Sequence, residues 1–310
     1  MKNLGKILYT SRTLYLFTKS DLPTSIVANT VFAVAGTLAA PVMIHDVPAL
    51  DSLGIIRGIL VSLYFTWHLT LCFNLGNQRQ RRSIVEDAIN KPWRPIPAGR
   101  ISPESALAYQ LISILSLLTL CATTLGASKE AIYLFCTWLY NERGWGDKSW
   151  WQRTLMNACG ITTNLAASLR VAAAAAAAPG VQERGMVRFT DRTVGWLAIC
   201  AAIIFTTIQV QDLRDQEGDA QIHRRTVPLV LGDAPTRWLT AVAIWIWSAA
   251  SPLYWGLGYV GCLFAILIGG VAAAHLLVYR DRISDNRSFK LVGTWWMLLY
   301  FLPVLALYGL

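Results

Sequence analysis

Long apolar runs are the feature that most constrains how this chain can fold. Nine segments of the 310-residue sequence are largely apolar, and several are near 20 residues long. A helix of about 20 apolar residues spans the roughly 30 Å hydrocarbon core of a bilayer. We therefore predict an all-α integral membrane bundle of about nine transmembrane helices. The expected spans are 22–44, 54–75, 104–126, 129–141, 154–178, 193–211, 236–256, 260–279 and 291–309.

The basic residues predict the orientation of these spans. If the N-terminus is cytosolic, the cytosolic segments carry 21 of the 27 lysines and arginines, and the opposite side carries four. This bias follows the positive-inside rule and favours a cytosolic N-terminus, with an odd number of spans. The net charge of +9 is then a topology signal, so no nucleic-acid partner is expected. No cleavable signal peptide is expected, and the membrane would be the endoplasmic reticulum in a eukaryote.

A cluster of acids follows the sixth span, in the loop 211–237. Asp212, Asp215 and Asp219 are spaced i, i+3 and i+7, positions that share one face of a helix. Glu217 points elsewhere and is expected to be solvated. Carboxylates on one face repel one another unless a cation lies among them, and oxygen ligands favour Mg²⁺. The alternative, a solvated helix end, would place these acids against the helix dipole.

A second group of oxygen donors follows the second span, in the loop 73–102. It comprises Asn77, Ser83, Glu86, Asp87 and Asn90. The residues at 83, 87 and 90 share one helical face, and the one at 86 lies at its edge. Prolines at 92, 95 and 97 then exclude helix and hold the following cations at a set distance.

Together the two loops predict a clamp for a diphosphate. Metal ions would bridge carboxylate and phosphate oxygens, and arginines can bind the remaining oxygens bidentately. Such a clamp stabilises the charge that develops on a departing diphosphate. Because it lies at the cytosolic mouth of the bundle, an apolar tail would extend into the membrane interior. The predicted diphosphate ligands are Asn77, Lys91, Arg94, Arg170, Arg224 and Arg225.

Arg170 is included because it lies inside the fifth span, where an ionisable residue is a functional hypothesis by default. Asn164 precedes it near the same helical face. Either side chain is expected to reach the diphosphate or a polar layer of the cavity. The loop 140–153, rich in Trp and charge, is either an interfacial aromatic belt or a lid over the cavity.

The two loops resemble the motifs of one enzyme family. DLRDQEGD at 212–219, followed by R-x-T-x-P-L at 224–229, resembles the second Asp-rich motif of the UbiA prenyltransferase superfamily. The first loop, with NKPWRPIPAGRIS, is similar to the first motif. The resemblance implies one domain over 1–310 with a central cavity, and Mg²⁺-dependent ionisation of an allylic prenyl diphosphate.

The resemblance also assigns metal ligands, with one departure. Asp212, Asp215 and Asp219 match the second motif, and Asp87 matches the last Asp of the first. Ser83 stands where an earlier Asp is usual, and Glu86 would supply the missing charge. Asn77 is the counterpart of the motif's Asn only if two residues are inserted.

The sequences of the first loop and of YNERGWGD resemble those of the UbiA-type terpene cyclases of fungi and bacteria. These convert farnesyl or geranylgeranyl diphosphate into cyclic terpenes without an aromatic acceptor. Aromatic faces can stabilise the carbocations, and the candidates are Trp67, Phe73, Tyr133, Trp138 and Tyr140, although each could serve only packing. An aromatic-acceptor prenyltransferase is the alternative. A lipid or ion transporter would instead place its charges near the bilayer midplane.

Overall fold

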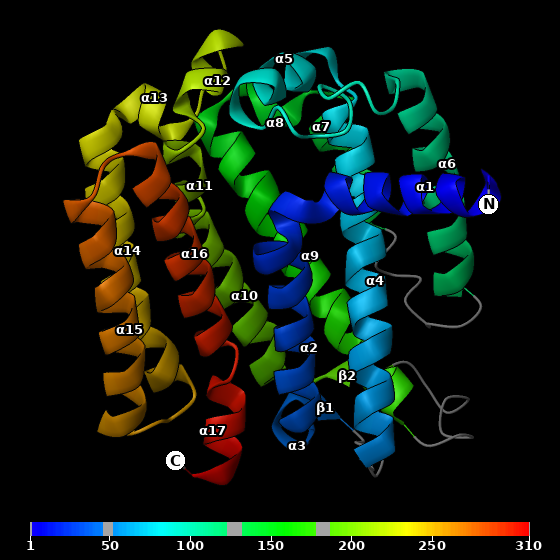
Figure 1. Ribbon diagram of the computed structural model, residues 1–310. Helices are drawn as coiled ribbons and strands as arrows, with labels where there is room; N and C mark the ends of the chain where they lie inside the picture. The colour runs from blue at the N-terminus through cyan, green and yellow to red at the C-terminus, as the bar shows by residue number, and fades with distance from the viewer. Residues whose placement is uncertain (1, 46–51, 123–131, 178–186, 310) are drawn as a thin grey trace.

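The computed structural model describes residues 2–45, 52–122, 132–177 and 187–309. Its long helices run side by side between two ends, with most of the short helices gathered at one end and the C-terminus at the other (Figure 1). Strand β1 (Ile44–His45) pairs antiparallel with β2 (Arg188–Phe189) at the same end as the C-terminus. Apart from this pair, the regular structure of the described residues is helical, as the all-α prediction requires.

Each predicted span overlaps at least one helix. The long elements and their continuations are α2 (Ala28–Leu38), α3 (Ala40–Met43), α4 (Ser52–Gln78), α6 (Pro103–Leu120), α7 (Ile132–Asn141), α9 (Trp150–Ala176), α10 (Asp191–Thr207), α14 (Asp233–Tyr254), α15 (Tyr259–Val278), α16 (Arg282–Leu299) and α17 (Leu302–Tyr308). Parts of three predicted spans, at 123–126, 129–131 and 178, lie outside the described residues.

Five helical stretches within the described ranges are both long and apolar enough to cross a bilayer. They are Ser52–Gln78, Pro103–Leu120, Asp191–Leu213, Gly261–Val278 and Arg282–Tyr308. This supports a multi-pass membrane protein, while the number nine stays a prediction. Helix α9 is as long as these stretches, but it carries the polar residues Asn157, Asn164 and Arg170 and is not among the five.

Several helices begin at residues whose side chains cap them. Ser102 accepts a hydrogen bond from the backbone NH of Ser105 at the start of α6, and Pro103 occupies the first turn. Thr190 caps α10 in the same way, through the NH of Thr193. Such caps satisfy backbone donors that the first helical turn leaves unpaired. The boundaries therefore follow from local sequence as well as from packing.

Helix α9 lies at the centre of the bundle and packs against α2, α4 and α10. A Cβ atom added at Gly58 of α4 would lie 2.8 Å from the carbonyl oxygen of Ala172. Only a glycine lets the two backbones approach so closely, a common device of membrane helix packing. Trp196 and Trp295 fill the interior between the later helices, where both are fully buried.

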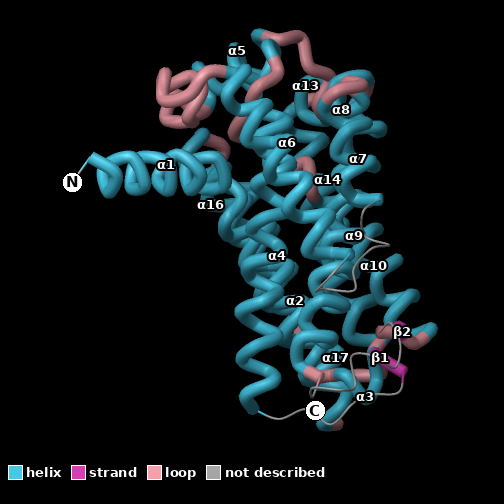
Figure 2. Tube along the Cα trace, turned by 90° about the vertical axis from the view of Figure 1, so that its right-hand side faces the viewer, coloured by secondary structure: helices cyan, strands magenta, loops and turns pink. Residues whose placement is uncertain are grey.

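The short helices carry the two motif loops to the same end of the molecule (Figure 1). They are α5 (Arg81–Asn90), α8 (Trp145–Lys148), α11 (Val210–Leu213), α12 (Gln216–Gln221) and α13 (Val227–Leu231). Helix α1 (Lys2–Thr18) extends sideways from the bundle (Figure 2). It joins α2 through η1 (Lys19–Asp21) and η2 (Leu22–Val27).

A buried ion cluster fixes the later helices below the motifs. Arg237 of α14 is fully buried and donates to Asp285 of α16 at 2.6 and 2.9 Å. It also donates to Asp233, whose Oδ2 accepts from Gln216 of α12 at 3.1 Å. Because a buried guanidinium is costly without partners, this cluster holds α12, α14 and α16 in one arrangement.

Candidate active site

The second motif does not lie on one continuous helix, contrary to the prediction. Helix α11 ends at Leu213, and Asp215 occupies the cap position before α12. The three carboxylates therefore take different partners. Asp212 accepts from Arg153 at 3.1 Å, Asp215 from Lys91 at 2.8 Å, and Asp219 from Arg224 at 2.8 Å. The prediction that residues spaced i, i+3 and i+7 share one face assumed an unbroken helix. It is wrong here because the chain breaks between α11 and α12.

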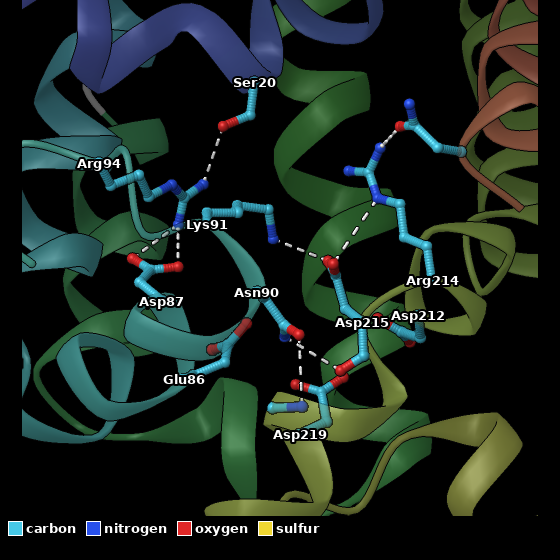
Figure 3. Close-up of polar contacts among 12 residues, drawn as sticks. Ser20, Glu86, Asp87, Asn90, Lys91, Arg94, Asp212, Arg214, Asp215 and Asp219 are labelled. Atoms are coloured by element: carbon cyan, nitrogen blue, oxygen red, sulfur yellow. Dashed lines mark hydrogen bonds and ion pairs between the residues drawn. The ribbon is translucent and has the colours of Figure 1, made fainter. Parts of the chain in front are cut away.

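The first motif does form the predicted helix, α5, and its three donors Ser83, Glu86 and Asp87 are buried. Both carboxylate oxygens of Asp87 accept from Arg94 Nη1, at 2.7 and 2.9 Å (Figure 3). The same guanidinium donates to Ser20 at 3.1 Å. Two predicted ligands, an acid and a cation, are thus paired with each other.

Glu86 is the acid of the first motif that reaches the second. Arg224 Nη1 donates to Glu86 Oε2 at 2.6 Å and to Asp219 Oδ1 at 2.8 Å. Its Nε donates to Asp147 Oδ1 at 2.7 Å. One guanidinium therefore joins both motifs and the loop that contains α8.

Asp147 was not among the predicted site residues. Its loop was interpreted as an aromatic belt or a lid, and the signal that was missed is the acid between its tryptophans, one of two acids in the loop with Glu142. Tyr140, at the start of the same loop, accepts from Arg153 at 2.5 Å. Because Arg153 also holds Asp212, the loop contacts the site at two places, which agrees with the lid interpretation.

Asn90 ties the two motifs together through backbone groups. Its amide nitrogen donates to the carbonyl oxygen of Asp215 at 3.0 Å, and its amide oxygen accepts from the NH of Gly218 at 3.3 Å (Figure 3). A Cβ atom at Gly218 would lie 2.3 Å from Asn90 Nδ2. Asn90 was predicted to bind metal, but in the structure both of its amide atoms hold the second motif in place.

Asn77 and Ser83 lie on a neighbouring hollow of about 320 Å³, which Arg224 and Asp147 also line. The amide nitrogen of Asn77 donates to Asn141 Oδ1 at 2.9 Å. Asp215 instead lines another hollow, with Lys91 and Arg214. The part of Asn77 and Ser83 in metal binding stays a prediction.

The buried carboxylates differ in protonation. Burial raises the pKa of Asp219 to about 7, helped by the charge of Asp212 and opposed by Arg153 and Arg224. For Asp215 burial acts in the same direction, but Lys91 and Arg214 outweigh it and lower the pKa. Burial also raises the pKa of Asp87 despite its pairing with Arg94. The cations thus favour the ionised form of Asp215, whereas the raised pKa of Asp219 favours its protonated form below about pH 7.

The donor set suits Mg²⁺ bound together with a phosphate ligand. Within the described ranges no three His, Cys, Asp or Glu side chains form a metal cage. Mg²⁺ does not require one, because it usually binds one or two carboxylates, several waters and substrate phosphates. Oδ2 of Asp219 is buried and has no hydrogen-bonding partner among the described residues. Asp219, with Glu86 or Asp212 as the second carboxylate, could therefore hold the ion together with waters and a phosphate ligand.

A cavity of about 110 Å³ reaches into the bundle beside the motif end. Three predicted cavity residues line it: Phe73 of α4, Tyr140 of α7 and Asn164 of α9. The Phe73 and Tyr140 rings lie 5.6 Å apart. Asp21 and Asn29 also line the cavity and were not predicted. Asp21 ends η1, and Asn29 lies eight residues later, in α2. The two polar residues were missed because 22–44 was predicted as one apolar span, with Asp21 directly before it.

Two aromatic candidates lie elsewhere. Trp67 packs with Phe17 and Leu71 beside α1, because it lies about 120° around α4 from Phe73. Trp138 is 45% exposed and faces the Arg143 guanidinium. The side chain of Tyr133 is outside the described residues.

Two predicted diphosphate ligands are also placed differently. Arg170 lies 17 residues beyond Arg153 on α9, about 25 Å along the helix, so it cannot reach the motifs. Its guanidinium lies 4.6 Å from the centre of the Phe189 ring of β2. Arg225 is exposed at the surface next to buried Arg224, and its contact with a diphosphate stays a prediction.

Fold and site together define a helical membrane protein with a buried cluster of acids and cations beside a cavity. The UbiA prenyltransferase family model matches residues 34–302, so the chain belongs to that family.

Two curated relatives match nearly the whole chain. The chain is 27% identical to a somaliensene A/B synthase of Streptomyces somaliensis, over 92% of this chain and 89% of that one. It is 29% identical to a fumagillin beta-trans-bergamotene synthase of Aspergillus fumigatus, over 97% and 95%.

Two solved structures share the fold. A digeranylgeranylglyceryl phosphate synthase superposes with a TM-score of 0.60 at 16% identity, covering 96% of this chain and 98% of that one. A UbiA homolog from Archaeoglobus fulgidus bound to GPP and Mg²⁺ gives a TM-score of 0.56 at 12% identity, covering 94% and 99%.

Proposed function

We propose that this protein is a Mg²⁺-dependent membrane terpene cyclase. It ionises farnesyl or geranylgeranyl diphosphate and cyclises the resulting carbocation to a sesquiterpene or diterpene. The observation that carries the proposal is the contact of one Arg224 guanidinium with Glu86 and Asp219. It brings acids of both motifs to one point, where they could share a metal ion that also binds the diphosphate.

The cations and acids divide the work of ionisation. Asp219, with Glu86 or Asp212 as the second carboxylate, would hold Mg²⁺, which would supply positive charge to the diphosphate as the carbon–oxygen bond breaks. Lys91 and Arg214, on the Asp215 side of the site, would bind the oxygens of the leaving group. Because the site is buried, each of these interactions is stronger than in water.

The cavity receives the hydrocarbon chain. Phe73 and Tyr140 line its wall beside the motif end, where the first carbocation would form. Their ring faces can stabilise positive charge that passes them, by roughly 0.5–2 kcal/mol each. The loop with α8, held by Asp147 and Tyr140, would exclude water from this region.

The relatives support the cyclase assignment. Two proteins with terpene synthase names align over more than nine-tenths of this chain. The A. fulgidus homolog was solved with a prenyl diphosphate and Mg²⁺, which supports the same substrate class here. The motif end is assigned to the cytosol by the distribution of basic residues.

A transferase is the second candidate. The likeness to a digeranylgeranylglyceryl phosphate synthase favours it, because such an enzyme joins a prenyl group to an acceptor. The two functions differ in whether an acceptor is needed.

The test is incubation of purified membranes with C10, C15 and C20 prenyl diphosphates and Mg²⁺, with no acceptor. We expect a cyclic product in the hexane extract. Turnover that appears only when a phenolic or glycerophosphate acceptor is added would assign the transferase instead.

A further inference from the structure

Two buried amides in the cavity have atoms without a partner. Asn29 of α2 is 1% exposed and Asn164 of α9 is 3% exposed, and both line the cavity. Among the described residues, neither amide atom of Asn29 has a hydrogen-bonding partner, and neither has the amide oxygen of Asn164. Buried polar groups are normally paired, so an exception needs a reason such as a ligand.

The two residues lie on neighbouring turns of packed helices and line one cavity. Ser168 of α9 donates to the carbonyl oxygen of Asn29 at 3.1 Å. Asn164 precedes Ser168 by four residues, which is one helical turn on the same face. The two asparagines therefore come from adjacent turns of two packed helices.

Their unpaired atoms complement a hydroxyl group. Asn29 offers both a donor and an acceptor, and exchanging its nitrogen and oxygen would change nothing because both are unpaired. Asn164 offers an acceptor. A hydroxyl oxygen can accept from one amide and donate to the other, whereas a hydrocarbon would leave both unpaired.

The position is remote from the diphosphate. Asn164 lies eleven residues beyond Arg153 on α9, about 16 Å along the helix axis. The distal part of the hydrocarbon chain, not the leaving group, would occupy this depth.

We propose that Asn29 and Asn164 form a hydroxyl-binding site inside the cavity, and that it holds the water that ends the carbocation reaction. This inference rests on the proposed cyclase function and specifies its product class as a terpene alcohol. The alternative source of the same group is the hydroxyl of an acceptor molecule, in case the enzyme is a transferase.

The reaction would end when the bound water adds to the carbocation. A lone pair of the bound water forms a C–O bond to the cationic carbon, and one O–H bond of that water breaks. The proton passes through further water in the cavity to the carboxylate of Asp21, which lines the same cavity eight residues before Asn29 and accepts from Asn74 at 2.8 Å. The sum is prenyl diphosphate plus water giving terpene alcohol, diphosphate and one proton.

The experiment uses the full-length protein in membranes, Mg²⁺ and a prenyl diphosphate in ¹⁸O-labelled water. The wild type is expected to give a cyclic alcohol that carries one ¹⁸O atom. In Asn29→Leu and Asn164→Leu, the ratio of alcohol to cyclic hydrocarbon should fall about tenfold, as for the loss of one or two hydrogen bonds to the oxygen. Thr37→Val is the matched control, because Thr37 is buried on α2 and bonds only within its helix, to Ala33.

Thermal stability is the second readout. Replacing an unpaired buried amide by an apolar group of similar size is neutral or stabilising. The Tm of purified Asn29→Leu should therefore equal or exceed that of the wild type. A clear fall in Tm would show that the amide has a structural partner and would overturn the proposal.

The product pattern separates failure of this inference from failure of the proposed function. A wild type that makes only cyclic hydrocarbon would overturn the hydroxyl site and leave the cyclase intact, as would an alcohol yield unchanged in both leucine variants. If the wild type instead prenylates a phenol, the cyclase proposal fails. The site then stands if Asn29→Leu raises the acceptor KM, and it falls if that KM is unchanged.

Discussion

Arg224 Nη1 lies 2.6 Å from Oε2 of Glu86, a residue 138 positions earlier in the chain. The contact joins two loops that the sequence separates by four predicted spans. Each loop alone is a row of polar residues at a helix end. Together they form a buried cluster in which acids and cations alternate, and this alternation is what a diphosphate and a metal ion require.

Arg224 should be essential for turnover. Arg224→Met removes the shared donor and leaves Glu86 and Asp219 buried without it, so we expect product formation to fall by about 100-fold or more. Arg224→Lys keeps the charge but not the fork of donors, and should recover little. Arg287→Gln, an exposed arginine of α16, is the control and should retain wild-type turnover. Equal activity in Arg224→Met and the control would remove Arg224 from the site.

Asp87 and Arg94 should contribute to stability as a pair. The Asp87 side chain is fully buried, and Arg94 nearly so. Asp87→Leu strands a buried cation and should destabilise the protein by about 3–5 kcal/mol. In the double variant Asp87→Leu/Arg94→Met both charges are gone, so the Tm measured in detergent should return most of the way to wild type. Additive losses in the double variant would contradict a coupled pair.

Gly218 and Asn90 should be coupled by their close approach. Gly218→Ala places a methyl group against the Asn90 amide, so the second motif must shift and activity should fall. Asn90→Ala removes the tether but creates space, and the double variant should lose less than the sum of the two single losses. Kinetics of the four proteins in this cycle measure the coupling. Strict additivity would mean that the contact does not position the motif.

Mg²⁺ dependence should vary with pH through Asp219. Its pKa is raised to about 7, so below that pH the carboxyl is mostly protonated and a metal ion must displace the proton. The Mg²⁺ concentration for half-maximal activity should therefore rise as pH falls from about 8 to about 6. A Mg²⁺ requirement that stays constant across this window would remove Asp219 from the metal ligands.

The sequence predicted the frame of the site well. The helix at α5, the two motif loops at one end and the cavity residues Phe73, Tyr140 and Asn164 all follow from local periodicity or from family motifs. These features depend on residues that are near one another in the sequence, so they can be predicted from a single sequence.

Contacts between distant segments could not be predicted. The contact of Arg224 with Glu86 is the clearest example. Asp87 and Arg94 are only seven residues apart, and their pairing was missed because each side chain also fits a ligand set. At the break before Asp215, this residue contacts Asn90 and Lys91, which spacing within the second motif does not predict. Arg170 satisfied the rule for intramembrane charge, yet the length of α9 carries it to the other end of the bundle. The position of Arg170 along the α9 axis places it far from the motifs. The spacing of residues within a span does not show which end of the helix carries the site.

The most direct test of the central claim is the stoichiometry of diphosphate release without any acceptor. Membranes containing the protein are incubated with farnesyl or geranylgeranyl diphosphate and Mg²⁺, and released diphosphate and cyclic product are quantified in the same samples. We expect one cyclic terpenoid for each diphosphate released, with both lost in Arg224→Met. Diphosphate release that yields only linear alcohol, or that requires an added acceptor, would contradict it.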